Sequence, residues 1–224
     1  MGMVTAAKAH NIDGFTNCMS YFSAKLLHFG RFFFTFVSIN FYFDIVLKII
    51  VVTGPESVGK STLCEQLSAI YNAVFIPEFA RTYVEKLHAP YGYNDVEYIA
   101  RHQIEELERY KKKYAGTMPF LFVDTYLIVT KIWFSECYHT LPQWLPKAID
   151  DSKIDLYLLC KPDIEWQYDP VRENGSEKQR QYLYECYKRE LEEHEFPFEE
   201  VSGLGDNRVA MCEQMIEKHF GTCV

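Results

Sequence analysis

The sequence contains no long hydrophobic run and no paired cysteine motif. Its most apolar stretch, residues 32–43, ends at Asp44, whereas a transmembrane helix needs about 20 apolar residues. The seven cysteines form no C-x-x-C pair and no cysteine–histidine spacing typical of a zinc site. We therefore expect that the thiols are reduced and that the protein is cytoplasmic. We expect no stable membrane insertion.

Clusters of positive charge are also rare. The net charge is -8, and no basic cluster exceeds Lys111-Lys112-Lys113. Because proteins bind nucleic acids largely by neutralising phosphates with basic side chains, we expect no nucleic-acid partner. The sequence contains no internal repeat or low-complexity linker, and it carries no signal for an oligomeric state.

The composition is that of an ordinary globular protein, with 48% hydrophobic and 24% charged residues in a chain of 224. This length fits one domain better than two, and we assign residues 47–224 to that domain. Residues 1–46 form an apolar extension that resembles the start of a signal peptide but has no small-residue cleavage site. Three interpretations stay open: an extra packed segment, an interfacial anchor, or disordered upstream sequence from a start site assigned too early, which we favour.

A complete phosphate-binding (Walker A) motif of the form G-x-x-x-x-G-K-[ST] is present. It comprises Gly54, Pro55, Glu56, Ser57, Val58, Gly59, Lys60 and Ser61, followed by Thr62. The β-branched run 48–53 precedes it and the amphipathic run 62–71 follows it, which is the strand-to-helix context that the motif requires. Successive backbone N–H groups can then face the β-phosphate of ATP, Lys60 can bridge the β- and γ-phosphates, and Ser61 is placed to ligate Mg²⁺.

Strand-like and helix-like segments alternate along the rest of the chain. The expected strands are residues 48–53, 73–77, 119–124, 154–160 and 198–201. This alternation predicts right-handed βαβ crossovers. The predicted fold class is therefore α/β. With its phosphate-binding motif the chain resembles proteins of the phosphate-loop NTPase fold, which implies a five-stranded parallel sheet in the order 2-3-1-4-5 with helices on both faces.

Two short patterns predict where helices begin. Residues 94–97 and 176–179 have the form of capping boxes, with Asn94 and Ser176 as the N-caps. One face of the helix after Asn94 is marked by Val96, Ile99, Gln103, Leu107 and Tyr110.

A phosphate loop alone is compatible with a GTPase, a motor-type ATPase or a small-molecule kinase. No N-K-x-D guanine signature occurs, which argues against a GTPase. Asp124 ends an apolar strand, as a Walker B aspartate that holds the Mg²⁺ shell does, and a helix N-cap is the alternative role. Glu78 follows another strand and could orient or deprotonate an acceptor hydroxyl, with Arg81 to position the substrate; a surface ion pair is the alternative.

The segment 161–175 is polar, is punctuated by proline and glycine, and contains Arg172. It suits a lid that closes on ATP and delivers a cation to the transferring phosphoryl group. Arg172 is the preferred lid arginine, Arg180 is the second choice, and a mobile surface loop is the alternative. Five aromatic residues could form a wall for a flat ring or serve core packing: Tyr91, Tyr93, Trp133, Trp144 and Trp166.

Four segments together resemble the ribosylnicotinamide kinase domain of NadR-type proteins. They are residues 54–62, 77–81, 122–125 and 166–172, and the resemblance runs from about residue 47 to about residue 220. It implies ATP-dependent phosphorylation of the 5′-hydroxyl of nicotinamide riboside, a small nucleoside, to nicotinamide mononucleotide in NAD biosynthesis. It also implies that the segment ending at Arg208 packs near the adenine.

Two departures from this family alter the expectation. NadR-type proteins commonly carry an adenylyltransferase domain with an H-x-G-H-like motif, which this sequence lacks, and residues 1–46 are too few for a helix-turn-helix domain. We therefore expect any second step of NAD synthesis and any repressor role to lie in another polypeptide. In the lid, Pro170 stands where the family usually has glycine, which would stiffen the segment.

These observations define the candidate site. The catalytic candidates are Lys60, Glu78, Asp124 and Arg172; the ATP-binding candidates are Gly54, Glu56, Ser57, Val58, Gly59, Lys60, Ser61, Thr62 and Arg208; the substrate-binding candidates are Glu78, Arg81, Asp124 and Trp133; the Mg²⁺ ligands are Ser61 and Asp124. The leading hypothesis is an ATP-dependent kinase that acts on nicotinamide riboside. A regulatory phosphate-loop ATPase and a kinase for another nucleoside or metabolite are the alternatives.

Overall fold

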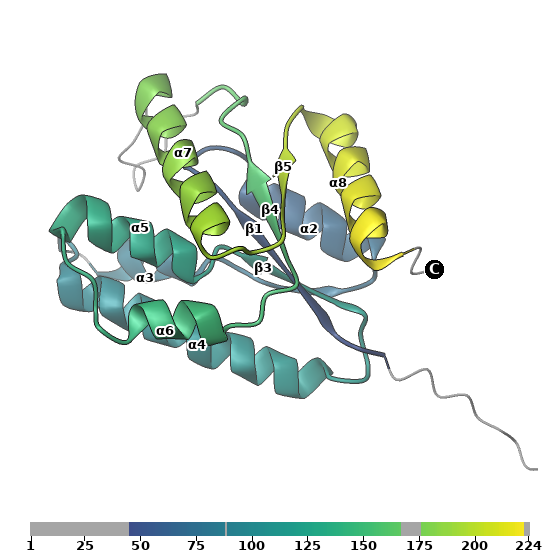
Figure 1. Ribbon diagram of the computed structural model, residues 1–224, viewed down its shortest axis with the longest axis horizontal. Helices are drawn as coiled ribbons and strands as arrows, with labels where there is room; N and C mark the ends of the chain where they lie inside the picture. The colour runs from purple at the N-terminus through teal and green to yellow at the C-terminus, as the bar shows by residue number, and fades with distance from the viewer. Residues whose placement is uncertain (1–44, 88, 167–175, 222–224) are drawn as a thin grey trace, which may run out of the picture. The chain divides into compact units, whose positions relative to one another are not determined.

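The computed structural model describes residues 45–87, 89–166 and 176–221, and these residues form a parallel sheet covered by helices on both faces (Figure 1). The elements in chain order are β1 (Lys48–Thr53), α2 (Lys60–Ile70), β2 (Val74–Ile76), α3 (Phe79–Lys86), α4 (Tyr93–Tyr114), β3 (Phe120–Asp124), α5 (Leu127–Tyr138), α6 (Leu145–Asp151), β4 (Leu156–Cys160), α7 (Glu177–Glu193), β5 (Phe198–Val201) and α8 (Gly205–Phe220). The five strands pair in the order β2-β3-β1-β4-β5. The fold class and the strand order predicted from the sequence are thus confirmed.

The central strand β1 is apolar on both faces because helices cover both of them. Ile50 and Val52 pack with α2 and α8, whereas Ile49 and Val51 pack with α4, α5 and α7. This alternation follows from the two-residue period of a strand. A continuous β-branched run is therefore stable here, as is usual for a parallel sheet buried on both sides.

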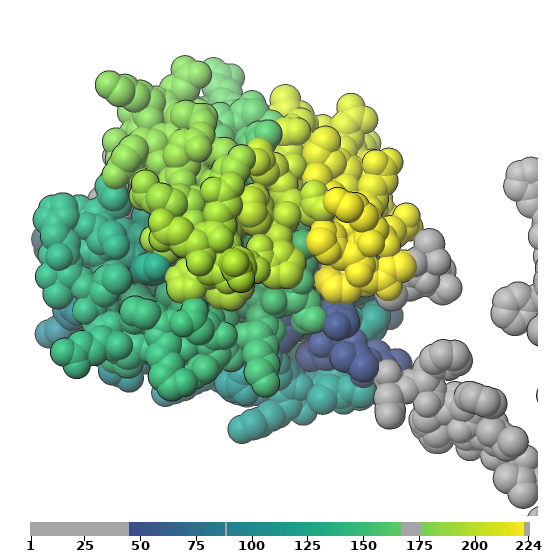
Figure 2. Space-filling model, in the orientation of Figure 1, coloured from purple at the N-terminus to yellow at the C-terminus, as the bar shows by residue number. Residues whose placement is uncertain are grey.

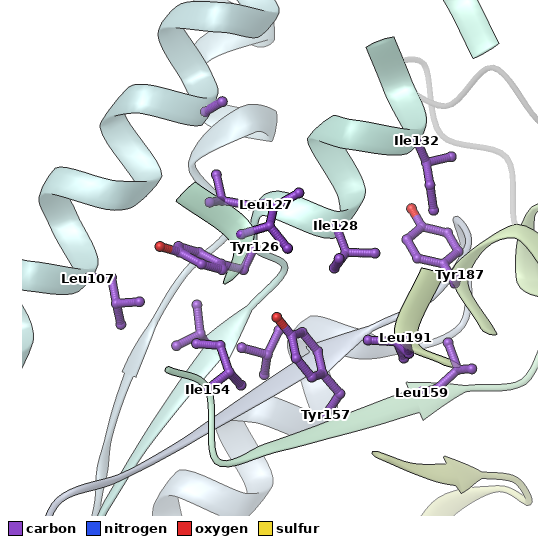
Figure 3. Packing of buried hydrophobic residues seen from close by; sticks show 14 of the residues in the cluster. Leu107, Tyr126, Leu127, Ile128, Ile132, Ile154, Tyr157, Leu159, Tyr187 and Leu191 are labelled. Atoms are coloured by element: carbon purple, nitrogen blue, oxygen red, sulfur yellow. The ribbon is translucent and has the colours of Figure 1, made fainter. Parts of the chain in front are cut away.

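The larger of the two cores lies between the sheet and helices α4 to α7. In Figure 3, Tyr157 and Leu159 of β4 face Leu191 of α7 and Ile128 of α5. All four side chains are almost completely buried, so this packing fixes the position of α5 and α7 over the sheet. These two helices also line the cavity described below.

Helices α7 and α8, which pack on opposite faces of the sheet, are both visible in the space-filling view, and the start of β1 lies below them (Figure 2). Among the described residues, no helix combines the length and the apolar character needed to cross a membrane.

The helix starts agree with the sequence in one case and differ in the other. Ser176 caps α7, since its hydroxyl accepts the N–H of Gln179 at 3.1 Å. The prediction for α4 was wrong by two residues: Gly92 is the N-cap, and the carboxylate of Asp95 accepts the Gly92 N–H at 2.7 Å. Asp95 thus takes the role that the pattern assigned to Glu97, because a carboxylate three residues after the cap serves whichever residue starts the helix.

The carboxyl ends of three strands meet at one edge of the sheet. Val52 of β1 pairs with Asp124 at the end of β3, and Ile76 at the end of β2 pairs with Val123. The phosphate loop follows β1 and Glu78 follows β2. In an open α/β sheet this is the edge at which ligands bind.

Candidate phosphate-binding site and acceptor cavity

The loop between β1 and α2 has a backbone that depends on its glycines. Gly54 has a φ of 134°, and a Cβ atom there would lie 2.7 Å from the carbonyl oxygen of Cys160 at the end of β4. Gly59 has a φ of 72°, and a Cβ atom there would lie 3.2 Å from Ile164 Cδ1. Gly54 is therefore required mainly because β4 is so close, and Gly59 mainly because its backbone is left-handed.

The loop leads into the N-terminus of α2, which no side chain caps. The first N–H groups of a helix have no partner within it, and together with the helix dipole they favour an anion. Lys60 is the first residue of α2, and its Nζ donates a hydrogen bond to the Pro55 carbonyl oxygen at 2.7 Å. The Lys60 cation and the free N–H groups at the start of α2 therefore lie together at the phosphate loop, which is an arrangement suited to binding phosphate.

Asp124 lies next to this loop and is 2% exposed. Burial raises the pKa of this carboxyl group, and the nearby Lys60 charge and a hydrogen bond from the Ser61 hydroxyl only partly offset that effect. Within the described part of the chain, Oδ1 of Asp124 has no hydrogen-bond partner. A buried carboxylate oxygen without a partner, beside a hydroxyl, fits a hard cation such as Mg²⁺.

Ser61 and Asp124 are enough protein ligands for Mg²⁺. Among the described residues, no group of three or more histidine, cysteine, aspartate and glutamate side chains could hold a metal ion. Mg²⁺ commonly takes one or two protein oxygens and completes its shell with water and substrate phosphates. Ser61 and Asp124 fit that donor set.

A strained residue follows Asp124. Thr125 has a φ of 65°, which is unusual for a β-branched residue. Its N–H donates to the Val52 carbonyl oxygen at 3.0 Å, and its Oγ1 is buried and has no partner among the described residues. Such strain persists where the surrounding structure holds it, and it often marks a functional site.

A cavity of about 260 Å³ extends from the phosphate loop across the carboxyl edge of the sheet. The loop and the start of α2 form one end, and residues of α3, α4, α5 and α7 form most of the rest of the wall. The lining residues are Gly54, Pro55, Glu56, Ser57, Val58, Gly59, Lys60, Ser61, Thr62, Glu78, Ala80, Arg81, Val84, Tyr91, Gln103, Thr125, Val129, Thr130, Ile132, Trp133, Glu136, Cys137, Leu183 and Tyr187. All the predicted loop residues, together with Glu78, Arg81 and Trp133, thus line one cavity. Asp124 lines a small adjoining cavity that shares Gln103 and Thr125 with it.

Two carboxylates approach the buried Tyr187 on the far wall. Burial, followed by the charges of Glu78 and Glu56, raises the pKa of Tyr187. The ring comes from α7 and lies beside Ile132 of α5 (Figure 3). Glu78 is the N-cap residue of α3 but makes no side-chain cap bond there, so its carboxylate is directed elsewhere than to the helix end.

Aromatic side chains form one part of the wall. The Tyr91 and Trp133 rings are 4.7 Å apart and nearly perpendicular, and both line the cavity. Trp144 instead donates to Glu97 Oε1 at 2.8 Å, and Tyr93 packs on Phe134. Of the five aromatic candidates, only Tyr91 and Trp133 are among the lining residues.

The predicted arginines have different surroundings. Arg81 lines the cavity, and its Nε lies 3.1 Å from Glu85 Oε1. Arg180 is buried in α7 and donates to the Ile164 carbonyl oxygen at 2.8 Å. Arg172 lies outside the described residues, so its role as the lid arginine stays a prediction.

Arg208 is 4% exposed and lies behind the phosphate loop, outside the set of cavity-lining residues. It donates to the carbonyl oxygens of Val58 and Gly203, both at 2.9 Å, and to Asp163 Oδ1 at 3.1 Å. It therefore joins the loop to the start of α8 and to the segment after β4. A contact between Arg208 and ATP stays a prediction. These hydrogen bonds indicate that Arg208 supports the phosphate loop.

Several lining residues were not predicted from the sequence, among them Gln103, Thr125, Thr130, Glu136 and Tyr187. Gln103 had a signal, because a polar residue interrupts the apolar face of its helix. Glu136 and Tyr187 had none, because they enter the site from helices whose approach depends on long-range packing.

Comparison with known proteins agrees with this geometry. A family model described as an AAA domain matches residues 49–208. The trifunctional NAD biosynthesis/regulator protein NadR of Escherichia coli (strain K12) is 26% identical over 180 residues, which cover 78% of this chain and 43% of that protein. The protein of the same name from Salmonella typhimurium is 25% identical over the same length. The chain thus spans less than half the length of the curated relatives it matches.

Solved structures share the fold. A NadR protein in complex with NR has a TM-score of 0.65 and 24% identity, over 79% of this chain and 50% of that one. The thymidylate kinase from Candida albicans has a TM-score of 0.56 and 14% identity, over 76% and 91% of the two chains. The deoxyadenosine kinase from M. mycoides has a TM-score of 0.50 and 13% identity, over 76% and 99%.

The family match covers most of the chain and includes both the phosphate loop and Asp124. We conclude that this chain belongs to the AAA domain family, as a phosphate-loop protein that resembles the NadR proteins over most of its length.

Proposed function

We propose that this protein is an ATP-dependent kinase that phosphorylates the 5′-hydroxyl of nicotinamide riboside to give nicotinamide mononucleotide. The observation that carries the proposal is the cavity itself, which the phosphate loop, Glu78 and an aromatic pair line together. A hydrolase needs room only for water beside the γ-phosphate. A kinase needs space for an acceptor as well, and the extension of this cavity from the loop to α3, α5 and α7 supports that requirement.

The loop end suits ATP as the phosphoryl donor. Backbone N–H groups at the start of α2 would bind the β-phosphate, and Lys60 would leave the Pro55 carbonyl to bridge the β- and γ-phosphates. Ser61 and Asp124 would hold Mg²⁺, which when bound offsets the negative charge of the phosphates. Since most catalysis of phosphoryl transfer is positioning and charge stabilisation, these groups supply most of what the donor side requires.

Glu78 is the proposed base for the acceptor hydroxyl. It lines the cavity, whereas Asp124 is buried beside Ser61 and Lys60 and lies outside that lining. A carboxylate that faces the acceptor can accept the hydroxyl proton as the O–P bond forms. Arg81 lines the same region and would orient the acceptor.

The acceptor wall suits a flat, positively charged ring. Tyr91 and Trp133 present aromatic surface, and Glu56, Glu78 and Glu136 add three carboxylates to the lining. Cations are attracted to aromatic faces and to carboxylates, and the nicotinamide ring of the riboside is cationic. The names of the curated relatives include NAD biosynthesis, and the similar NadR structure contains NR, which supports this choice of acceptor.

The test combines purified protein, Mg²⁺–ATP and a panel of nucleosides, with products identified by mass spectrometry. We expect a phosphorylated product from nicotinamide riboside. The Glu78→Gln variant should lower kcat by about 100-fold or more while the KM for ATP stays within about two-fold. Glu105→Gln, at an exposed position of α4, is the matched control and should behave as wild type.

Two results would count against the proposal. Release of ADP at the same rate with and without every nucleoside would favour a phosphate-loop ATPase instead. Preferred phosphorylation of a different nucleoside would keep the kinase and replace its acceptor.

A further inference from the structure

The middle of α4 places one polar side chain among apolar ones. Gln103 lies between Ala100 and Leu107 on the buried face of the helix and is 6% exposed. It lines the main cavity and also the small adjoining cavity beside Asp124. Within the described ranges, its Oε1 is buried and accepts no hydrogen bond.

A buried acceptor without a donor is unfavourable, because it has lost its hydrogen bonds to water and gained none in exchange. An apolar side chain of the same length would avoid this cost at the same position. Thr130, by contrast, has a partner, since it donates to the Leu127 carbonyl oxygen at 2.9 Å. Thr125 resembles Gln103, since its Oγ1 is also buried without a partner among the described residues and it lines the same two cavities.

We propose that Gln103 binds the acceptor nucleoside and selects for it, by accepting at Oε1 a hydrogen bond from a neutral N–H or O–H group of that molecule. The proposal rests on the proposed function in one respect, namely that the ligand of this cavity is a nucleoside. The donor is either an amide N–H on the base or a hydroxyl of the ribose. Thr125 Oγ1 supplies a second unpaired polar atom for the same ligand.

This arrangement disfavours an acceptor whose base carries a carboxylate instead of a carboxamide. A carboxylate has no proton to donate to Oε1, and Glu56, Glu78 and Glu136 line the same cavity and would repel it. Sites built around a hydrogen bond discriminate strongly, because the wrong ligand leaves a buried polar group unpaired. The predicted substrate class is therefore a nucleoside whose base bears an uncharged substituent, such as a carboxamide, and no carboxylate.

The experiment measures binding by calorimetry without ATP, so that it does not depend on phosphoryl transfer. The probes are nicotinamide riboside, its carboxylate counterpart, the pyridine riboside without a carboxamide, and 2′-deoxy nicotinamide riboside. The variants are Gln103→Leu and Gln103→Met, and the matched control is Gln214→Leu at an exposed position of α8. Thermal unfolding of each variant without ligand is measured in parallel.

We expect both Gln103 variants to bind nicotinamide riboside about ten-fold more weakly or worse, while the control binds as wild type. If the base donates, the variants and wild type will bind the pyridine riboside equally; if the 2′-hydroxyl of the ribose donates, they will bind the 2′-deoxy probe equally. In either case wild type should prefer nicotinamide riboside to the carboxylate probe. The ligand-free variants should melt at the same temperature as wild type or higher, because an unpaired acceptor has been removed.

Three results would overturn the inference. These are wild-type affinity for nicotinamide riboside in both variants, a large loss of thermal stability in both variants without ligand, and no binding of any probe by wild type. The proposed function fails separately: if wild type binds nicotinamide riboside through Gln103 but transfers no phosphoryl group to it, the binding role stands and the kinase assignment does not.

Discussion

Lys60 is the residue on which the donor side of the site depends most. Its ammonium group lies over the loop, where it donates to the Pro55 carbonyl oxygen, and it is the cation of the loop nearest to where the β- and γ-phosphates would lie. Lys60→Ala should therefore lower the rate of phosphoryl transfer by about 100-fold or more in a single-turnover assay, because charge on the transferring group would be left uncompensated. Lys112→Ala, at an exposed position of α4, is the control. A rate within three-fold of wild type for Lys60→Ala would contradict this role.

The charge of the Asp124 carboxylate is expected to favour metal binding but to lower the stability of the nucleotide-free protein. Burial raises its pKa above the ordinary value of 3.8, so the folded protein holds this proton to a higher pH than the unfolded chain does. The stability of the nucleotide-free protein therefore falls as the pH rises from 3.8 through the raised pKa. Asp124→Asn should remove this loss.

In urea unfolding at pH 7 without nucleotide, Asp124→Asn should thus be more stable than wild type, and the difference should shrink as the pH approaches 3.8. The same variant should bind Mg²⁺–ATP more weakly, because an amide oxygen is a poorer ligand for a hard cation than a carboxylate is. Asp151→Asn, at an exposed position of α6, should change neither quantity appreciably. A less stable Asp124→Asn variant at pH 7 would show that the carboxylate is needed for folding.

At the level of elements, the path of the phosphate loop depends on its contact with β4. Gly54→Ala would place a Cβ atom 2.7 Å from the Cys160 carbonyl oxygen at a φ of 134°, so either the loop or the end of β4 must move. We expect the free energy of unfolding in urea to fall by about 3 kcal/mol or more. Gly116→Ala is the matched control, with a φ of 70° and no atom within 4 Å of the new Cβ, and it should cost about 1–2 kcal/mol. Equal losses in the two variants would mean that the contact with β4 contributes little.

Helix α8 contributes to the site through the same loop. Arg208 lies in its first turn and bonds to Val58 of the loop and to Asp163 after β4. Three segments far apart in the sequence therefore meet at one buried guanidinium. This explains why an arginine near the end of the chain belongs to the region of the loop even though it lies outside the cavity lining.

For the whole molecule, nucleotide binding and stability are linked. A ligand that binds only the folded state stabilises it by about 2.7 kcal/mol at 100 times its Kd. Saturating Mg²⁺–ATP should therefore raise the Tm by several degrees for a domain of this size. Addition of EDTA should reduce the shift, because in the proposed site Ser61 and Asp124 would hold the cation together with the phosphates. If well-folded protein shows no shift in calorimetry, the nucleotide site is not functional.

Local patterns were sufficient for most of the architecture. The β-branched run at 48–53 and the glycine-lysine motif predicted β1, the loop and α2, because backbone geometry there depends on neighbouring residues. Ser176 was also predicted correctly as a helix cap. The start of α4 was not, because Asp95 and Glu97 are both acidic and a local pattern cannot distinguish which one will reach a backbone N–H.

The sequence alone was enough for the fold class and the residues of the phosphate loop, because these depend on hydrophobic periodicity and on a motif whose spacing is contiguous. The strand order was predicted through the resemblance of that motif to the phosphate-loop fold. The inner wall of the cavity depends on how α4, α5 and α7 pack over the sheet. Gln103, Glu136 and Tyr187 come from these three helices and meet only after that packing has formed. Which polar atoms remain buried without a partner, and hence what the cavity can bind, is therefore a property of long-range packing that no local pattern contains.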